Sequence, residues 1–166
     1  MTGGEAKMFE EAVRSHGPLV SRICSSYEAR PALAEELVQD TFSALWRALL
    51  RFRGEASLRT FVARIAHNTC VSHVRRESRV THADLEPETP SDLPGPEEEA
   101  GRSLARKRLL EAVRKLPIGQ RQVVTLHLEG FSDPEVADAL GLTPGNVAVR
   151  LTRARERLRR LMGVAA

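Results

Sequence analysis

The residues with the clearest chemical potential in this chain of 166 are the arginines that recur near its C-terminus. Residues 144–162 have the periodicity of a helix with one apolar face, and six of these positions are arginines. A guanidinium group donates parallel hydrogen bonds to a phosphate or to the edge of a guanine. Glu156 is the only acidic residue among them, so pairing along the helix cannot neutralise their charge. The pattern predicts contact with DNA, and the alternative is a solvated helix face. The residues predicted to make the contact are Asn146, Arg150, Arg153, Arg155 and Arg157.

The element that must position these arginines is a helix-turn-helix. Ser132 is followed three residues later by Glu135, which is the spacing of a capping box at a helix N-terminus. Gly141 is placed to end that helix, because glycine adopts a left-handed backbone without steric cost. Thr143 and Pro144 suit the N-cap and the first position of the second helix. Two short helices joined by a glycine-containing turn form the helix-turn-helix motif.

Charge divides the chain into three segments. Residues 77–102 contain 2 basic and 8 acidic residues together with several prolines, whereas the segments on either side are net basic. This composition cannot bury a core, so we expect residues 77–102 to form an acidic, flexible linker that is disordered or extended. The predicted fold is all-α, with two small helical domains over residues 7–76 and 103–162 and the helix-turn-helix in the second.

Hydrophobic periodicity predicts the remaining helices. The segments that show it most clearly are residues 31–50, 56–76, 103–115 and 120–129. Residues 1–7 are expected to be a frayed tail. Between this tail and Tyr27 the pattern is helical, but we expect an interruption at Gly17 and Pro18, because a proline within a helix kinks or restarts it.

Composition and motifs exclude several classes of function. There is no Gly-rich phosphate loop and no paired nucleophile and base, so neither an enzyme activity nor a catalytic residue or cofactor is predicted. His67 and His73 lie near Cys70 without zinc-finger spacing, so no metal site is predicted. Cys24 and Cys70 lie in helical patterns and are expected to be buried free thiols. The absence of a secretory segment or long apolar run predicts a cytoplasmic protein without membrane insertion.

Two polar surfaces are predicted on the first domain. Glu35, Glu36, Gln39 and Asp40 gather in the N-terminal half of one helix, where they either interact favourably with the helix dipole or form an acidic docking face. The residues alone leave both interpretations open. A later helix carries polar and cationic side chains opposite its apolar side, which suits base reading and phosphate binding or an ordinary solvated face. These side chains are Arg59, His67, Asn68, Ser72, Arg75 and Arg76.

The order of these segments resembles the ECF (extracytoplasmic function) sigma factors of bacterial RNA polymerase, within the sigma-70 family, over residues 7–162. The segment AEELVQDTFSALWRAL is similar to the part that docks on the beta-prime clamp helices of the polymerase. RTFVARIAHNTCVSHVRR resembles the segment that melts and reads the minus-ten promoter element. The stretch from LPIGQRQVV to LTRARERLRRL resembles the reader of the minus-thirty-five element.

The resemblance implies a role for each polar group. Glu36, Gln39 and Asp40 match polymerase-docking positions, and Asn68 matches a residue implicated in recognising a flipped-out base. The arginines and Asn146 near the C-terminus match the minus-thirty-five reader. The resemblance also implies a contact with the beta flap of the polymerase and an anti-sigma factor as a further partner. The residues that it assigns to the minus-ten element are Arg53, Arg59, Asn68, Ser72, Arg75 and Arg76.

Some positions depart from the family pattern. Phe61 and Ala63 replace a frequent Trp and Tyr, which reduces the aromatic support for strand melting. Asn146, Ala148 and Val149 stand where Thr, Lys or Arg, and Ser are frequent. These changes alter the base preference, and the methyl groups of Ala148 and Val149 suit contact with thymine.

The function expected from the resemblance is promoter-specific initiation of transcription by a protein that binds core RNA polymerase and performs no bond chemistry. Each domain reads one promoter element, and the free protein is expected to bind a promoter weakly. The alternative is a conventional helix-turn-helix transcription regulator. Its first domain would sense a ligand or dimerise, and its target would be a palindromic operator.

Overall fold

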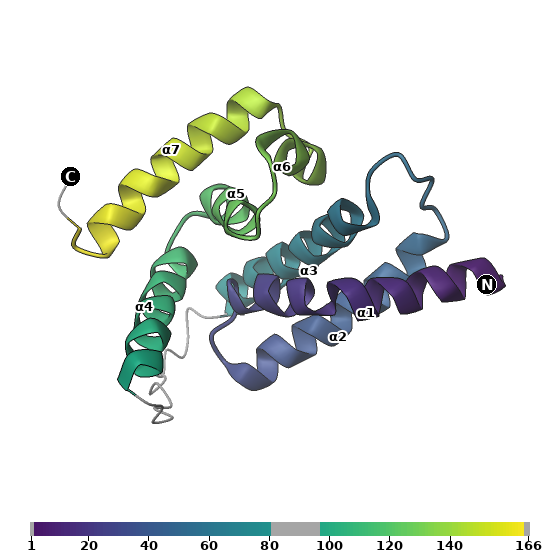
Figure 1. Cartoon of the computed structure of the whole chain (residues 1–166), viewed down its shortest axis with the longest axis horizontal. Coiled ribbons are helices and arrows are strands. Elements are labelled where there is room, and N and C mark those ends of the chain that lie inside the picture. The colour runs from purple at the N-terminus through teal and green to yellow at the C-terminus, as the bar shows by residue number, and fades with distance from the viewer. Residues whose placement is uncertain (1, 81–96, 165–166) are drawn as a thin grey trace.

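The structure, a computed structural model, describes residues 2–80 and 97–164, and helices are the only regular secondary structure over these residues. The helices are α1 (Gly3–Ser25), α2 (Pro31–Leu49), α3 (Leu58–Val80), α4 (Glu97–Arg114), α5 (Ile118–Leu128), α6 (Asp133–Leu140) and α7 (Pro144–Leu161). Figure 1 shows α1, α2 and α3 gathered side by side, with α5, α6 and α7 stacked on one side of them. The predicted all-α fold with two helical domains is confirmed.

The first domain is a bundle in which α1, α2 and α3 each pack against the other two. Leu37, Leu45 and Leu49 are buried on one face of α2, because residues four or eight apart lie on the same side of a helix. Val62 and Ala66 of α3 are fully buried against the same core. The bundle therefore fixes which faces of α2 and α3 remain outside.

The first helix is longer than predicted and continues without an interruption. α1 (Gly3–Ser25) contains Pro18 without a break, so the predicted interruption at Gly17 and Pro18 is wrong. A proline removes one hydrogen bond from the helix interior. Pro18 is exposed, whereas Leu19 and Val20 beside it are buried. Burial of these neighbours in the core outweighs the cost of the proline.

The frayed tail predicted for residues 1–7 is also wrong, except at Met1, which lies outside the described residues. The backbone N–H of Thr2 donates a hydrogen bond of 2.8 Å to the carboxylate of Glu5. This is one half of a capping box, which supplies a partner for a backbone donor at the start of a helix. α1 can therefore begin within the first three residues.

The predicted linker, residues 77–102, is described only at its ends, and residues 81–96 lie outside the described part of the chain. Both ends are helical instead of extended, because α3 continues to Val80 and α4 begins at Glu97. The extension of α3 is tied to the bundle, since Arg30 donates a hydrogen bond of 3.2 Å to the carboxylate of Glu77.

The helix-turn-helix has the caps that its sequence predicts. Ser132 and Glu135 form a capping box at α6, in which the Ser132 hydroxyl accepts from the Glu135 backbone N–H at 3.3 Å. Gly141 ends α6 with a φ of 67°, a left-handed conformation. The Thr143 hydroxyl accepts from the backbone N–H of Asn146 at 3.2 Å and caps α7. These local bonds set the angle at which α7 leaves the turn.

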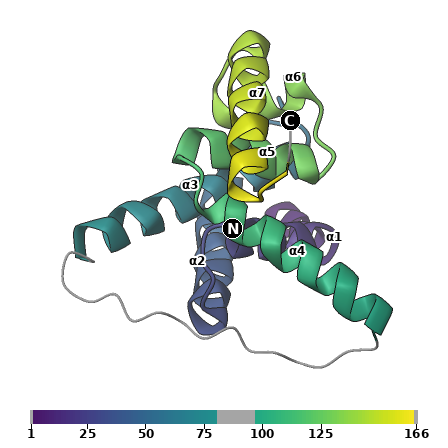
Figure 2. The same cartoon turned by 90° about the vertical axis from the view of Figure 1, so that its left-hand side faces the viewer.

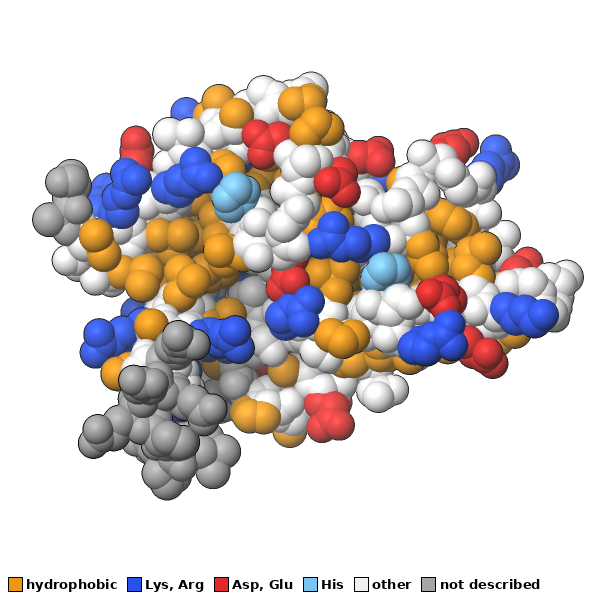
Figure 3. Space-filling view, viewed as in Figure 1, with side chains coloured by type: hydrophobic (Ala, Val, Ile, Leu, Met, Phe, Trp, Pro, Cys, Tyr) orange, Lys and Arg blue, Asp and Glu red, His pale blue; other side chains and the backbone are white. Residues whose placement is uncertain are grey.

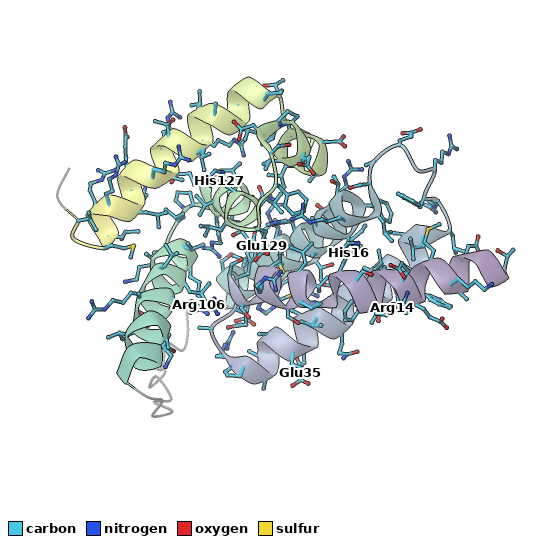
Figure 4. All side chains as sticks on the ribbon, viewed as in Figure 1. Arg14, His16, Glu35, Arg106, His127 and Glu129 are labelled. Atoms are coloured by element: carbon cyan, nitrogen blue, oxygen red, sulfur yellow. The ribbon has the colours of Figure 1, made fainter. Side chains whose placement is uncertain are left out.

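The two domains are in direct contact. α3 packs against both α5 and α6. The guanidinium group of Arg22 donates to the carboxylate of Glu129 at 2.9 Å, and the Thr125 hydroxyl lies 3.2 Å from that of Ser26. Figure 4 shows Glu129 at the junction of α5 with the first three helices. A continuous buried core joins the two domains in this arrangement.

Both cysteines are buried free thiols, as predicted. Their Sγ atoms lie 3.8 Å apart, Cys24 on α1 and Cys70 on α3. The hydroxyl of Thr41 lies 3.9 Å from the Cys24 sulfur. The hydrogen bond from Cys70 lowers the pKa of Cys24, while this contact and burial raise the pKa of Cys70. Together with Thr41 of α2, the two cysteines thus link the three helices of the first domain.

Candidate nucleic-acid interface

The outer side of α7 carries an exposed row of polar and cationic side chains. Val147, Leu151 and Ala154 are buried on the inner side, where α7 packs against α5 and α6. Asn146, Arg153 and Arg157 are exposed and Arg150 is partly buried; we call these four residues the α7 ridge. Within the described residues, no acidic side chain pairs with the three arginines of the ridge. Their charge is therefore available to an anionic ligand.

Arg150 owes part of its position to a glycine on the neighbouring helix. A Cβ atom added to Gly119 of α5 would lie 2.7 Å from the Arg150 guanidinium nitrogen, closer than a normal contact. The absence of a side chain at Gly119 thus lets the guanidinium group of Arg150 lie against α5. This contact orders a residue that the sequence assigns to DNA.

Arg155, which was predicted to act with the ridge, faces another direction. Its guanidinium group lies 3.2 Å from the Nε2 atom of His127 on α5, an arrangement in which arginine donates and the neutral imidazole accepts. Figure 4 shows His127 under α7, on the α5 side. The structure therefore separates Arg155 from Asn146 and the ridge arginines, although Arg155 remains exposed.

Helix α3 carries an exposed row of polar and cationic side chains, which we call the α3 stripe. Asn68, Ser72, Arg75 and Arg79 lie at i, i+4, i+7 and i+11, so they share one side of the helix, and all four are exposed. Figure 2 shows that the end of α3 extends past α2 and away from the helix-turn-helix. The stripe is therefore open to a ligand along its C-terminal half.

The stripe forms one wall of a cleft between α2 and α3, which we call the α2–α3 cleft. Its volume is about 740 Å³, and it is lined by Asp40, Ser43, Ala44, Arg47, Thr69, Ser72, Arg75, Arg76 and Arg79. Three residues predicted to contact the minus-ten element, Ser72, Arg75 and Arg76, thus meet at one place. Sequence reasoning missed Arg47 and Arg79. The spacing of Arg79 from Arg75 would have identified it, but Arg47 comes from another helix.

Two other predicted minus-ten residues lie elsewhere. Arg59 donates a hydrogen bond of 2.6 Å to the backbone carbonyl of Glu129, and its guanidinium carbon lies 3.8 Å from the centre of the Phe131 ring. Burial lowers the pKa of His16, and the charge of Arg59 lowers it further. Arg53 lies in the loop between α2 and α3, beside a small hollow. The structure does not bring Arg53 or Arg59 together with Ser72, Arg75 and Arg76.

The acidic surface on α2 is exposed as well. Glu36, Gln39 and Asp40 line a shallow pocket with Ala32 and Glu35, which we call the acidic patch. Figure 4 shows Glu35 pointing away from the other helices. No acidic residue lies in the first turn of α2, where the helix dipole acts most strongly. This placement favours a docking face over a dipole effect.

His67 was predicted to lie with Asn68 on the polar side of α3, and this placement is wrong because the side chain is buried. His67 is fully buried, and its Nδ1 atom lies 2.7 Å from the hydroxyl oxygen of Tyr27. Burial lowers the pKa of His67 to about 3, so the ring is neutral near pH 7. The hydrogen bond between this neutral ring and the Tyr27 hydroxyl fixes α3 against the end of α1, and Asn68, the next residue, is exposed.

Two other features, a metal-binding cluster and a membrane-spanning helix, are absent from the described part of the chain. It holds no group of three or more His, Cys, Asp or Glu side chains placed to bind a metal ion. Over residues 2–80 and 97–164, none of the helices combines the length and the apolar character needed to span a bilayer.

Comparison with known proteins identifies relatives along the whole length. The family model described as sigma-70 region 2 matches residues 12–80, and that of sigma-70 region 4 matches residues 106–158. RNA polymerase sigma factor NccH of Alcaligenes xylosoxydans xylosoxydans is 32% identical, over 96% of this chain and 89% of NccH. ECF RNA polymerase sigma factor SigM of Mycobacterium tuberculosis is 31% identical, over 96% of this chain and 80% of SigM.

A solved structure has a similar arrangement of helices. The sigma factor RpoE of Bartonella quintana, in complex with the anti-sigma factor NepR, matches with a TM-score of 0.76 and 27% identity. The match covers 95% of this chain and 98% of RpoE.

Proposed function

Because this chain belongs to the ECF sigma factors of RNA polymerase, we propose that it binds core polymerase and directs the initiation of transcription at promoters. Each of its two domains reads one of the two promoter elements. The observation that carries this proposal is the presence of two separate cationic surfaces, the α7 ridge and the α3 stripe with its cleft, whose arginines pair with no acidic side chain among the described residues. Phosphate contacts of this kind supply affinity, and polar contacts to base edges supply specificity.

The α7 ridge is the proposed reader of the minus-thirty-five element. A recognition helix lies in the major groove and contacts base edges from its N-terminal part. Asn146 and Arg150 occupy the N-terminal half of α7, with Arg153 and Arg157 farther along. Arg155 is proposed to take part from another side of α7, because the residue is exposed although its guanidinium group contacts His127.

The α3 helix is the proposed reader of the minus-ten element. Asn68 offers an amide to a base, while Arg75 and Arg76 offer charge to the backbone. Arg53, in the neighbouring loop, suits a further backbone contact. Arg59 can join them only after its bond to the Glu129 carbonyl breaks.

The polymerase is proposed to dock on both domains. The acidic patch on α2 suits a basic surface, and the beta-prime clamp helices are its expected partner. Figure 3 shows a hydrophobic area between α7 and α4, which suits the beta flap. Large apolar side chains left exposed on or next to α4, α5 and α7 are Leu104, Leu128, Leu161 and Met162.

Regulation by an anti-sigma factor is part of the proposal, and so are a cytoplasmic location and the absence of enzyme activity. RpoE of Bartonella quintana, to which this chain is similar, was solved with an anti-sigma factor. We also propose domain boundaries at 7–76 and 103–162, close to the matched regions 12–80 and 106–158.

The test is transcription reconstituted from the purified full chain and bacterial core polymerase on fragments of the source genome. We expect co-purification with core polymerase and discrete run-off transcripts that core polymerase alone does not make. Failure to associate with core polymerase would contradict the proposal. Tight binding of a palindromic operator by the free protein would instead indicate a conventional helix-turn-helix regulator.

A further inference from the structure

The α2–α3 cleft concentrates positive charge on two walls. Arg47 lies on the α2 wall, and Arg75, Arg76 and Arg79 lie on the α3 wall. All four are exposed, and within the described residues none of them has a hydrogen bond or ion pair through its side chain. Of the residues that the structure describes, Asp40 is the only acidic one that lines the cleft. Four arginines facing one carboxylate leave a strong excess of positive potential in a concave site.

The other groups in the cleft suit phosphate oxygens. Ser43, Thr69 and Ser72 line it with hydroxyl groups, which donate hydrogen bonds to phosphate as arginine does. No large apolar side chain takes part in the lining, so little favours a hydrophobic ligand. A volume of about 740 Å³ accommodates a short stretch of sugar-phosphate backbone.

The surface next to the cleft indicates which polyanion binds there, nucleic acid or an acidic segment of the polymerase. Asp40 lines both the cleft and the acidic patch, so the two sites adjoin. A polymerase surface that docks on Glu35, Glu36 and Asp40 must be basic, and a basic surface is repelled by the arginines of the cleft. The cleft also continues the stripe that carries Asn68. Nucleic acid is therefore a better occupant than an acidic segment of the polymerase.

We propose that the α2–α3 cleft holds the phosphate backbone of promoter DNA next to the minus-ten element, and that Arg47 and Arg79 contact it from opposite walls. This inference rests on the proposed function, because it places a phosphate site beside the predicted base reader. It adds α2 to the DNA-binding surface. DNA binding and polymerase docking thereby share one helix, with Asp40 between the two sites.

The experiment uses holoenzyme reconstituted from the full chain and core polymerase, with Arg47→Ala, Arg79→Ala and the charge-preserving Arg47→Lys. The matched control is Arg14→Ala, an exposed arginine on α1 that pairs with Glu11. Figure 4 shows Arg14 far from the second domain. Binding to a promoter fork with a single-stranded minus-ten region is measured between about 50 and 200 mM salt, a range in which phosphate contacts are resolved.

Each alanine variant is expected to lose roughly tenfold in affinity at low salt, as for loss of one charged hydrogen bond. The slope of log affinity against log salt should fall by about 0.7 to 0.9, the contribution of one phosphate contact. Arg47→Lys should keep most of the slope, and Arg14→Ala should match the wild type. A neutral methylphosphonate at one backbone position should weaken wild-type binding and have no further effect on Arg47→Ala.

Three results would overturn the inference. Unchanged slopes in both alanine variants would exclude a phosphate contact. Weaker association with core polymerase, with normal DNA binding by the assembled holoenzyme, would assign the cleft to an acidic polymerase segment. An equal loss in Arg14→Ala would show a general charge effect. If the wild type itself forms no holoenzyme, the proposed function fails together with this inference, which distinguishes that case from the first three.

Discussion

Arg59 and Glu129 join the two domains through a hydrogen bond of 2.6 Å from a guanidinium group to a backbone carbonyl. Glu129 lies directly after α5, where the last carbonyls of a helix carry partial negative charge. Arg64 makes the same kind of contact with the end of α6, because it donates to the carbonyls of Asp138 at 2.6 Å and Ala139 at 3.3 Å. Arginines of α3 thus bind the C-terminal ends of two helices in the other domain.

We expect this contact to open when a promoter is bound. Promoter elements read by separate domains lie more than one helical turn apart, beyond about 34 Å. Domains that share a core cannot reach that span. Opening also releases Arg59, which the closed arrangement uses for the Glu129 carbonyl and the Phe131 ring.

We expect Glu129→Arg to shift the free protein towards an open form. The substitution removes the partner of Arg22 and places a third positive charge beside Arg22 and Arg59. Small-angle X-ray scattering should give a larger radius of gyration than for the wild type. Glu111→Arg on the exposed side of α4 is the matched control and should leave it unchanged. Identical scattering from Glu129→Arg and wild type would show that the contact does not depend on this charge.

The sequence predicted the local structure well where neighbouring residues determine it. Ser132, Glu135, Gly141 and Thr143 lie within a few bonds of the groups that they cap, so their spacing was sufficient. Pro18 was misinterpreted because packing of distant helices, and not local propensity, keeps α1 intact.

The assignment of Arg59 to the DNA face illustrates what sequence reasoning did not resolve. Arg59 lies at i, i+4, i+7 and i+11 with Ala63, Ala66 and Cys70, which are all buried, so its spacing already indicated the inner side of α3. Its actual partners, Glu129 and Phe131, lie at least 70 residues away in the chain. Contacts of that separation leave no periodic signal, and neither does the meeting of α2 and α3 in the cleft.

Gly119→Ala tests whether the position of Arg150 matters for binding of the minus-thirty-five element. The new methyl group would meet the Arg150 guanidinium, which is flexible enough to move, so the stability should change by less than about 0.5 kcal/mol. Holoenzyme binding to the minus-thirty-five element should weaken.

The matched background for this test is Arg150→Ala. This substitution should itself cost roughly 1–3 kcal/mol of promoter-binding free energy if Arg150 binds a guanine bidentately. In that background Gly119→Ala should have no further effect on binding, measured by titration of fluorescent promoter DNA. An equal loss from Gly119→Ala in both backgrounds would mean that the methyl group acts through something other than Arg150.

The buried thiols should react only when the first domain opens. Cys24 and Cys70 are both inaccessible, and each contacts the other. We expect a thiol reagent such as Ellman's reagent to label the native protein slowly and at one common rate, and to label two thiols at once in denaturant. Fast labelling of one cysteine in the native protein would indicate local opening between α1 and α3 that leaves the other thiol protected.

Acid should weaken the first domain through Glu28. Its carboxylate, almost fully buried, accepts hydrogen bonds from Arg30 at 2.6 Å and lies 3.0 Å from the Nε2 atom of His73 on α3. Burial alone would raise the pKa of Glu28, but these hydrogen bonds outweigh it and lower the pKa to about 2 from an ordinary value of 4.5. Because the folded state holds the ionised form more strongly than the unfolded chain, the stabilisation is complete above pH 4.5 and is lost as the pH falls towards 2.

Urea denaturation at several pH values measures this loss. Glu28→Gln should cost about 1–3 kcal/mol at pH 7, since a buried partner of Arg30 and His73 is removed. It should also flatten the dependence of the unfolding free energy on pH in the acid range. Glu55→Gln, at an exposed position in the loop before α3, is the matched control and should keep the wild-type profile. A Glu28→Gln variant that still loses stability between pH 4.5 and 2 as steeply as the wild type would assign the acid sensitivity to other carboxylates.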